Sequence, residues 1–332
     1  MADAPALRIG FIGTGIMGGP MARRLAEAGF AVAAWNRSLA KTAALRPFGV
    51  VPATSPREAA GNADVLLCML SSGPVCDEVI FGKSGAAEAL RPGATVLVMS
   101  SIAPKEAREQ AMKAAALGLG YVDAPVSGGE KGAKGGTLAI MAGGSAEAVE
   151  RLGPVFAPLG HATHVGPAGS GSLAKLCNQL IVATTIGAVS EALLLAEQGG
   201  ADPARVREAL LGGFADSTIL RQHGLRMVTG DFAPGGPAKY QIKDTGAALD
   251  AAASLGLDLP LAATVDRLFR SLVEHGGADL DHSALILELK RANGLAGERN
   301  GFSAGSPAVS GDSGGFPVAD PANTRMAAEP SP

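Results

Sequence analysis

Aromatic residues, cysteine and an excess of charge of either sign are scarce in this chain, and each shortage excludes a class of function. Aromatic residues make up 4% of the 332 residues, which leaves few platforms on which single-stranded nucleic acid could stack. Acidic and basic residues are interspersed and the formal net charge is −3, so there is no basic block to bind a phosphate backbone. We therefore expect no nucleic-acid partner.

The cysteines are too few to hold the fold together. Cys68, Cys76 and Cys177 are an odd number and lack the spacing of metal ligands. They predict no disulfide framework and no metal site, and they fit a reducing compartment. The chain does not start with a basic region followed by a hydrophobic segment, so we expect no signal peptide and a cytoplasmic location.

Uninterrupted hydrophobic runs are also lacking. Residues 180–196 form a long apolar stretch, but Glu191 and several Thr and Ser side chains interrupt it. A membrane-spanning helix needs about 20 predominantly apolar residues in succession. We interpret this stretch as a helix inside the protein, and we expect no membrane partner.

Short apolar runs and helix-like segments alternate through the first half of the chain. Such alternation predicts a parallel sheet covered by helices, in which the buried strands are continuous apolar runs. The predicted strands are residues 7–12, 30–35, 64–70, 94–99, 121–125, 137–142 and 159–165.

A glycine-rich turn with the pattern G-x-G-x-x-G lies between the first predicted strand and a helix at residues 20–28. In a dinucleotide-binding turn the first glycine permits the tight turn and the second lets a pyrophosphate approach the backbone. The third allows helix and strand to pack closely. The helix N-terminus then offers free N–H groups to the phosphates. The candidate cofactor-binding residues are Gly13, Thr14, Gly15, Ile16, Met17 and Gly18.

The strands, helices and glycine turn of the first half predict an α/β dinucleotide-binding domain, and the helix-like segments after it, with no convincing strand, predict an all-helical region. A chain of 332 residues is too long for one ordinary core, and 47% apolar residues can fill two. We place the first domain at residues 1–167 and the second at 168–293, joined by a long helix at about 170–198. Residues 294–332 are rich in Gly, Ser, Pro and Ala, and this composition predicts a disordered tail.

The second predicted strand ends at Asn36, Arg37 and Ser38. A turn that binds NAD usually has Asp or Glu at this point to accept hydrogen bonds from the ribose hydroxyls. Here Arg37 could bind a 2′-phosphate through its charge and Ser38 through its hydroxyl. An ordinary polar loop has the same composition. We expect NADP ahead of NAD as the cofactor, with these residues as its ligands.

Ligands of open parallel sheets bind at the carboxyl ends of the strands. Met69, Leu70 and Ser101 follow two of the predicted strands, so we expect them along a bound cofactor. For Met69 and Leu70, packing in the core is an alternative that would coexist with this contact.

Ser127, Gly128 and Gly129 follow another predicted strand. Two glycines after a serine can leave consecutive backbone N–H groups free to bind an anion. The alternative is a simple turn. Residues 133–137 (AKGGT) are predicted to be a second flexible loop.

Lys175 and Asn178 lie near the start of the predicted long helix. Residues three apart share one helical face. A solvated surface pair is the ordinary interpretation of such residues.

Three segments together resemble the β-hydroxyacid dehydrogenases, the family that includes 3-hydroxyisobutyrate dehydrogenase and tartronate semialdehyde reductase. They are residues 13–29 (GTGIMGGPMARRLAEAG), 123–138 (DAPVSGGEKGAKGGTL) and 169–179 (GSGSLAKLCNQ). Lys243-Asp244 at the start of a helix is a further match. The resemblance covers residues 7–293, with the motifs in the family's order.

The resemblance implies an α/β Rossmann N-terminal domain and an all-α C-terminal domain joined by a long helix. It also implies a role for each matching residue. Lys175 would be the catalytic residue, with Asn178 beside it. The segment Ser127, Gly128 and Gly129 would bind a substrate carboxylate, and Lys243 would contact substrate or nicotinamide. Many members have an acid where this chain has Val98 and a threonine where it has Ser101, a departure that leaves the exact substrate open.

We therefore expect an NAD(P)-dependent oxidoreductase that moves a hydride between nicotinamide and a small β-hydroxy acid or semialdehyde, with Lys175 as general acid or base. One alternative is a reductase of imines or carboxylate-free carbonyls, although imine-reducing relatives usually lack the lysine. Another is a non-catalytic dinucleotide-binding interaction protein. Helical domains with large apolar faces often bury them against another subunit, so we expect a homodimer or homotetramer.

Overall fold

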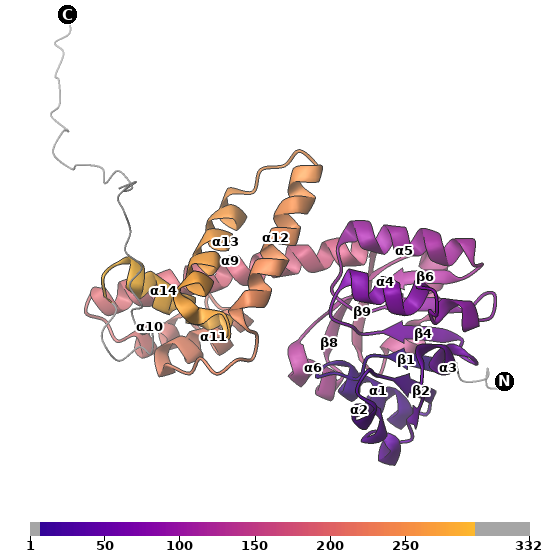
Figure 1. Ribbon diagram of the computed structural model, residues 1–332. Helices are drawn as coiled ribbons and strands as arrows, with labels where there is room; N and C mark the ends of the chain where they lie inside the picture. The colour runs from indigo at the N-terminus through magenta and orange to yellow at the C-terminus, as the bar shows by residue number, and fades with distance from the viewer. Residues whose placement is uncertain (1–6, 296–332) are drawn as a thin grey trace, which may run out of the picture. The chain divides into compact units, whose positions relative to one another are not determined.

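The computed structural model describes residues 7–295, in which a nine-stranded sheet is followed by helices (Figure 1). The strand order is β3-β2-β1-β4-β5-β6-β8-β7, and β9 pairs with β8. Strands β1 to β6 are mutually parallel, whereas β8 is antiparallel to β6 and β7. The strands are β1 Arg8–Ile12, β2 Ala31–Trp35, β3 Val51–Pro52, β4 Val65–Cys68, β5 Thr95–Val98, β6 Gly120–Asp123, β7 Val126–Ser127, β8 Leu138–Gly143 and β9 Gly160–Gly166.

Helices cover both faces of this sheet, because its central strands are apolar on both sides. All four residues of β4 and of β5 are buried. One core contains Phe11 with Met21 and Leu25 of α1, and the other contains Leu66 with Ile80 of α4. The helices of this part are α1 Gly18–Glu27, α2 Leu39–Ala43, α3 Pro56–Ala60, α4 Gly73–Phe81, α5 Pro104–Ala116, α6 Gly129–Gly135, α7 Ala146–Arg151 and α8 Gly153–Phe156.

Seven of the nine strands coincide with predicted strands, and β3 and β7 do not. Both consist of two residues, too few to show an apolar period. The prediction of a flexible loop at residues 133–137 is wrong, since α6 runs through Gly135. Ala133 is buried against the sheet, and this packing outweighs the low helix propensity of the glycines around it.

After β9 the described part of the chain is helical. The long α9 (Ser170–Gln198) is the helix predicted at about 170–198, and it packs against α10 to α14 and against β8. The others are α10 Pro203–Leu210, α11 Thr218–Thr229, α12 Ala238–Ser254, α13 Pro260–Leu272 and α14 Leu285–Ala292. A parallel-dominated Rossmann-like sheet followed by a helical region confirms the predicted fold class. Most of the predicted tail lies outside the described residues.

By length and composition alone α9 could cross a membrane, since its most apolar window has a mean hydropathy of 1.7. Its surroundings point to a different role. Leu176, Ile186 and Leu193 are buried, and the helix is flanked by elements from both halves of the chain. We therefore interpret α9 as the central helix of the helical region.

Candidate active site

The glycine turn between β1 and α1 has the geometry that a pyrophosphate requires. Gly13 has a φ of 96°, and a side chain there would collide with the carbonyl of Met69. A Cβ on Gly18 would collide with the carbonyl of Gly13, so this glycine lets α1 pack against the turn. A Cβ on Gly15 would meet nothing within 4 Å, which leaves its backbone open to a ligand. In this turn Gly13 and Gly18 are required for close packing, whereas Gly15 leaves room for a ligand, as dinucleotide binding demands.

Thr14 connects this turn to the end of β2. Its backbone N–H donates to Asn36 Oδ1 at 3.2 Å, and Asn36 Nδ2 donates to the carbonyl of Ser38 at 3.2 Å. Thr14 Oγ1 is buried and has no hydrogen-bond partner in the described part of the chain. A bound dinucleotide would supply that partner, because buried hydroxyls are nearly always hydrogen-bonded.

Arg37 and Ser38 are exposed beside Asn36. Among residues 7–295, Arg37 has no ion-pair partner, so its guanidinium is available to a ligand. The residues predicted to surround the adenosine end of the cofactor therefore lie next to the glycine turn.

The chain after β4 continues this line of groups. Met69 and Leu70 lie against Gly13, as the close approach of the Met69 carbonyl and Leu70 Cδ2 to that glycine shows. Ser100 Oγ accepts a hydrogen bond from the Leu70 N–H at 2.7 Å and so fixes the end of β4. Ser100 is buried, whereas its neighbour Ser101 reaches a cavity.

That cavity has a volume of about 200 Å³ and lies between the carboxyl ends of β4 and β5 and the helices α9 and α12. It brings together three of the predicted residues, Ser101, Lys175 and Lys243. Lys243 Nζ lies 3.4 Å from the carbonyl oxygen of Ser71, the residue after Leu70. The remaining lining residues are Ser72, Gly73, Pro74, Ile102, Ala103, Glu106, Leu176, Gln179, Asp244 and Ala247.

Burial in this cavity shifts the pKa values of two of its residues, Lys175 and Asp244. Burial lowers the pKa of Lys175 from the ordinary 10.5, because desolvation disfavours the ammonium, and the nearby charge of Asp244 acts in the opposite direction. Burial raises the pKa of Asp244, and the hydrogen bond from Gln179 and the charges of Lys243 and Lys175 act against that rise. A lysine with a lowered pKa can donate and accept a proton closer to neutral pH than a solvated one.

Asn178 does not line the cavity, although it lies one turn from Lys175 on α9. Its Nδ2 donates to Gln179 Oε1 at 2.8 Å, and Gln179 Nε2 donates to Asp244 Oδ2 at 2.5 Å. Asn178 thus reaches the site through Gln179. Neither Gln179 nor Asp244 was predicted to take part in the site. Their positions beside Asn178 and Lys243 in two of the motifs were the available signal.

Ser127, Gly128 and Gly129 lie outside the cavity as well. Ser127 ends β7, and Gly129 opens α6, so the first N–H groups of that helix have no partner within it. Gly128 and Gly129 have φ angles of 135° and 59°. The segment is therefore a turn and a helix start combined, and α9 packs against β7 next to it.

Asp123, for which the sequence predicted no role, fixes the start of α9. Its carboxylate is fully buried and accepts hydrogen bonds from the N–H groups of Gly169 at 2.7 Å and Ser172 at 2.6 Å. These N–H groups at the helix N-terminus have no partner within the helix. A carboxylate at this position also interacts favourably with the helix dipole. Asp123 thereby sets the position of Lys175 one turn later.

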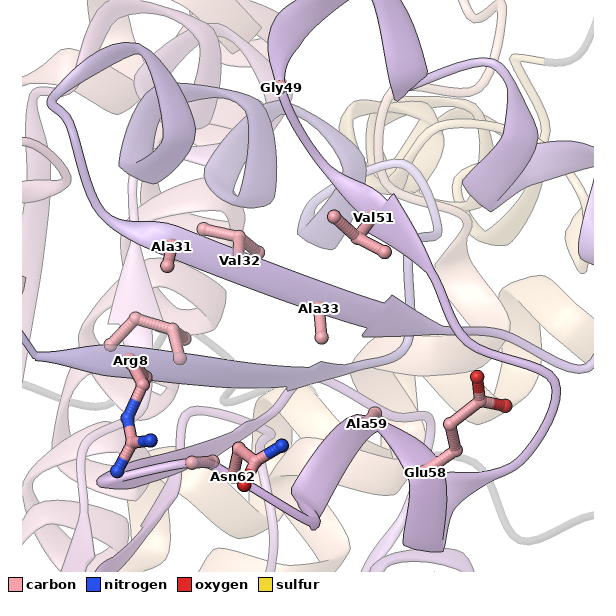
Figure 2. Close-up of a pocket in the computed structure, with 11 residues that line it drawn as sticks. Arg8, Ala31, Val32, Ala33, Gly49, Val51, Glu58, Ala59 and Asn62 are labelled. Carbon is pink, nitrogen blue, oxygen red and sulfur yellow. The ribbon is translucent and has the colours of Figure 1, made fainter.

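A larger cavity, of about 330 Å³, lies at the amino ends of β1 and β2 (Figure 2). Arg8, Val51, Glu58 and Asn62 are among its lining residues. This is the edge of the sheet opposite the glycine turn, and no predicted site residue lines it. Although this cavity is larger, none of the predicted site residues lines it, so we do not interpret it as the active site.

Comparison with known proteins identifies the family. Residues 8–166 match the NAD binding domain of 6-phosphogluconate dehydrogenase, and residues 169–289 match the NAD-binding family of NADP-dependent 3-hydroxyisobutyrate dehydrogenase. The 2-hydroxy-3-oxopropionate reductase of Escherichia coli is 45% identical over 293 residues, which cover 87% of this chain and 100% of the relative. The chain belongs to the β-hydroxyacid dehydrogenase family.

Other members of the family agree with this assignment. A probable 3-hydroxyisobutyrate dehydrogenase-like protein of Arabidopsis thaliana is 37% identical over 290 residues, covering 87% of each chain. The structure of 3-hydroxyisobutyrate dehydrogenase from Mycobacterium tuberculosis with L-serine has a TM-score of 0.79 and 32% identity, covering 86% of this chain and 99% of the other. This β-hydroxyacid dehydrogenase is thus an NAD(P)-dependent oxidoreductase, as its sequence predicted.

Proposed function

We propose that this enzyme interconverts a short β-hydroxy acid and the corresponding semialdehyde, with Lys175 as the proton donor and acceptor. The observation that carries the proposal is the cavity in which Lys175, Lys243 and Ser101 converge next to the glycine turn. The relatives reported above are named reductases or dehydrogenases, which favours an enzyme over a non-catalytic binding protein.

Bound nicotinamide supplies the hydride for reduction or accepts it in oxidation. Lys175 protonates the carbonyl oxygen during reduction and removes the hydroxyl proton during oxidation. Lys243 reaches the chain after β4 and the cavity at once, so we place it between the cofactor and the substrate. Asn178 and Gln179 hold Asp244 near Lys175, and the charge of Asp244 thereby adjusts the pKa of Lys175.

The N–H groups at Ser127, Gly128 and Gly129 are proposed to bind the substrate carboxylate. Support comes from the free N-terminal donors of α6 and from the packing of β7 against α9. A carboxylate held there would orient the reacting carbon toward Lys175. The same interaction would distinguish hydroxy acids from carboxylate-free carbonyls and imines.

NADP is the proposed cofactor of choice. Arg37 and Ser38 are exposed beside Asn36, where they can contact a 2′-phosphate. The glycine residues, Thr14, Ile16 and Met17 would hold the pyrophosphate, and Met69 and Leu70 would lie along the rest of the cofactor.

The deciding experiment is a steady-state screen of short semialdehydes and hydroxy acids with NADPH and NADH in parallel. The names of the relatives point to 2-hydroxy-3-oxopropionate and 3-hydroxyisobutyrate as the first substrates to test. We expect turnover of one of these with NADPH preferred, and slower turnover of an aldehyde that lacks the carboxylate. Equal rates with and without a carboxylate would contradict the proposed anion site.

We further propose a cytoplasmic homodimer or homotetramer with two domains at residues 1–167 and 168–293. Ile181 and Leu195 on α9 are 67% and 75% exposed, and a second subunit would cover such apolar side chains. All three cysteines are free thiols, which suits a reducing compartment. Sedimentation of the purified protein tests the assembly, and a monomer at micromolar concentration would contradict it.

A further inference from the structure

The cavity that contains Lys175 also contains a carboxylate to which the proposed mechanism assigns no task. Glu106 lies in the first turn of α5 and lines the cavity together with Ser101. Its Oε2 accepts a hydrogen bond from the N–H of Ala103 at 2.7 Å, which holds the side chain against the start of the helix. The position of this carboxylate is therefore fixed by its own helix.

Gly73 leaves the space that this carboxylate occupies. It is the first residue of α4, and a Cβ there would collide with both carboxylate oxygens of Glu106. The carboxylate thus lies over the start of α4, where the partial positive charge of a helix N-terminus stabilises a negative group. The start of α4 therefore allows Glu106 to remain ionised in the cavity.

Oε1 of Glu106 keeps its capacity to accept hydrogen bonds. Among residues 7–295 the carboxylate accepts only the bond from Ala103, through Oε2. It forms no ion pair with these residues either, although Lys175 and Lys243 line the same cavity. A ligand in the cavity can therefore donate to Oε1.

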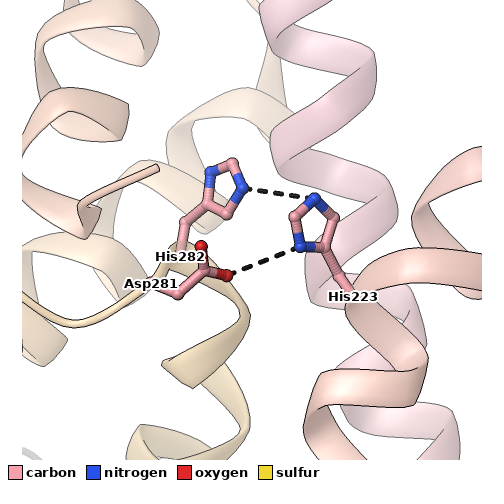
Figure 3. A group of neighbouring side chains, drawn as sticks. All are labelled: His223, Asp281 and His282. Carbon is pink, nitrogen blue, oxygen red and sulfur yellow. Dashed lines mark hydrogen bonds and ion pairs between the residues drawn. The ribbon is translucent and has the colours of Figure 1, made fainter. Parts of the chain in front are cut away.

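Asp281 in the helical region shows how a carboxylate that serves only the fold is paired. It accepts hydrogen bonds from the N–H groups of Gly235 and Gly236, each at 3.0 Å, and it lies beside His223 (Figure 3). A carboxylate can accept about four hydrogen bonds, and Asp281 uses this capacity within the protein. Glu106 uses little of it, which points to a partner that is not part of the chain.

Ser101 and Glu106 offer the two kinds of group that recognise a primary amide. A hydroxyl can donate to the amide oxygen, and an ionised carboxylate accepts from the amide NH2 group. The nicotinamide ring carries one such amide. In the proposed function this ring lies next to Lys175, because hydride passes between the ring and the substrate carbon.

We propose that Glu106 Oε1 accepts a hydrogen bond from the carboxamide of the bound nicotinamide, while Ser101 donates to the carboxamide oxygen. The pair fixes the rotation of the ring and so the face that it turns toward the substrate. The position of the ring rests on the proposed function. The contact itself concerns cofactor binding and not the proton transfer by Lys175.

The test compares NADP⁺ with its 3-acetylpyridine analogue, in which a methyl group replaces the amide NH2. The Kd of each is measured by calorimetric titration of the full-length protein without substrate, and NAD⁺ and its analogue are titrated in parallel. We expect the natural cofactor to bind about tenfold tighter, because the analogue loses a hydrogen bond to a charged group. Equal affinity of the unaltered protein for cofactor and analogue would contradict the contact.

Glu106→Gln separates cofactor binding from the stabilisation of the helix start. The new amide oxygen can still accept from Ala103, whereas the NH2 group that replaces Oε1 cannot accept. The preference for the natural cofactor should therefore disappear while the melting temperature changes little. Glu58→Gln is the matched control and should keep the preference, since Glu58 accepts from the Thr54 N–H at 2.7 Å outside this cavity.

Gly73→Ala is a second variant, and it leaves Glu106 in place. The added Cβ displaces the carboxylate, which is the flexible end of its side chain, and should also reduce the preference. A preference that persists in both variants would overturn the proposal, because Glu106 would then serve only the fold. A preference that both variants lose, in a protein that turns over no hydroxy acid, would support this contact and contradict the proposed function.

Discussion

The glycine turn and the Lys175 cavity are built from the sequence in different ways. The turn is continuous in sequence, and each of its glycines has a distinct steric reason: Gly13 and Gly18 pack, whereas Gly15 is open. The cavity is assembled from the ends of β4 and β5 and from two helices far along the chain. A site made of consecutive backbone groups can therefore be predicted from a short motif. The residues that surround a proposed catalytic side chain can be identified only from the structure, because they come from distant segments.

The largest effect is expected at the cavity. Lys175→Ala should lower kcat by about 10²- to 10⁴-fold, the usual contribution of one general acid–base group. Steady-state rates and cofactor binding should be measured together, because the glycine turn proposed to hold the cofactor is unchanged in this variant. Lys105→Ala, at a side chain that is 83% exposed on α5, is the matched control and should retain full activity. Wild-type turnover in Lys175→Ala would remove this residue from the mechanism.

Substitution of two glycines of the turn by alanine should affect different properties, stability for Gly18 and cofactor binding for Gly15. Gly18→Ala collides with the carbonyl of Gly13, so we expect a loss of stability of about 1–3 kcal/mol, typical of overpacking. Gly15→Ala meets no protein atom within 4 Å, so the fold should persist while cofactor binding weakens. Urea denaturation and cofactor titration of both variants check this contrast. Equal stability of the two variants would contradict the assignment of packing and open positions.

Asp123→Asn tests the link between the two regions, since this residue joins β6 to the start of α9. The amide can accept only one of the two hydrogen bonds from Gly169 and Ser172, which leaves a buried donor unpaired. We expect a loss of about 1–3 kcal/mol in unfolding free energy. A fall in kcat larger than the fall in cofactor affinity would show that Lys175 is displaced. An unchanged denaturation midpoint would contradict the capping role.

The smallest expected effect concerns cofactor choice. Arg37→Ala should raise the KM for NADPH about tenfold, which corresponds to about 1.4 kcal/mol, and leave that for NADH unchanged. The reason is the loss of one charged contact with the 2′-phosphate. Lys41→Ala, at an exposed position on α2, controls for a general loss of positive charge. Parallel loss with both cofactors would show that Arg37 does not distinguish them.

The sequence predicted the parts of the molecule that depend on local pattern. Continuous apolar strands, the glycine turn and the long helix follow from periodicity and steric needs, and Ser101 follows from its position after a strand. The contacts that complete the site span long separations. Asp123 caps a helix 46 residues away, and Gln179 meets Asp244 across 65 residues. No local pattern carries such pairings. In α6, tertiary packing overrode the glycine content that predicted a loop.

The most direct test of the central claim is the pH dependence of kcat/KM for reduction. In the proposed mechanism protonated Lys175 is the acid, and burial lowers its pKa from 10.5. The kcat/KM for reduction should therefore be highest at lower pH, where Lys175 is protonated. It should fall as the pH rises through a midpoint below 10.5, where Lys175 loses its proton. Lys175→Ala should lack this alkaline limb. A limb that persists in Lys175→Ala, or a flat alkaline profile in the unaltered enzyme, would contradict the account.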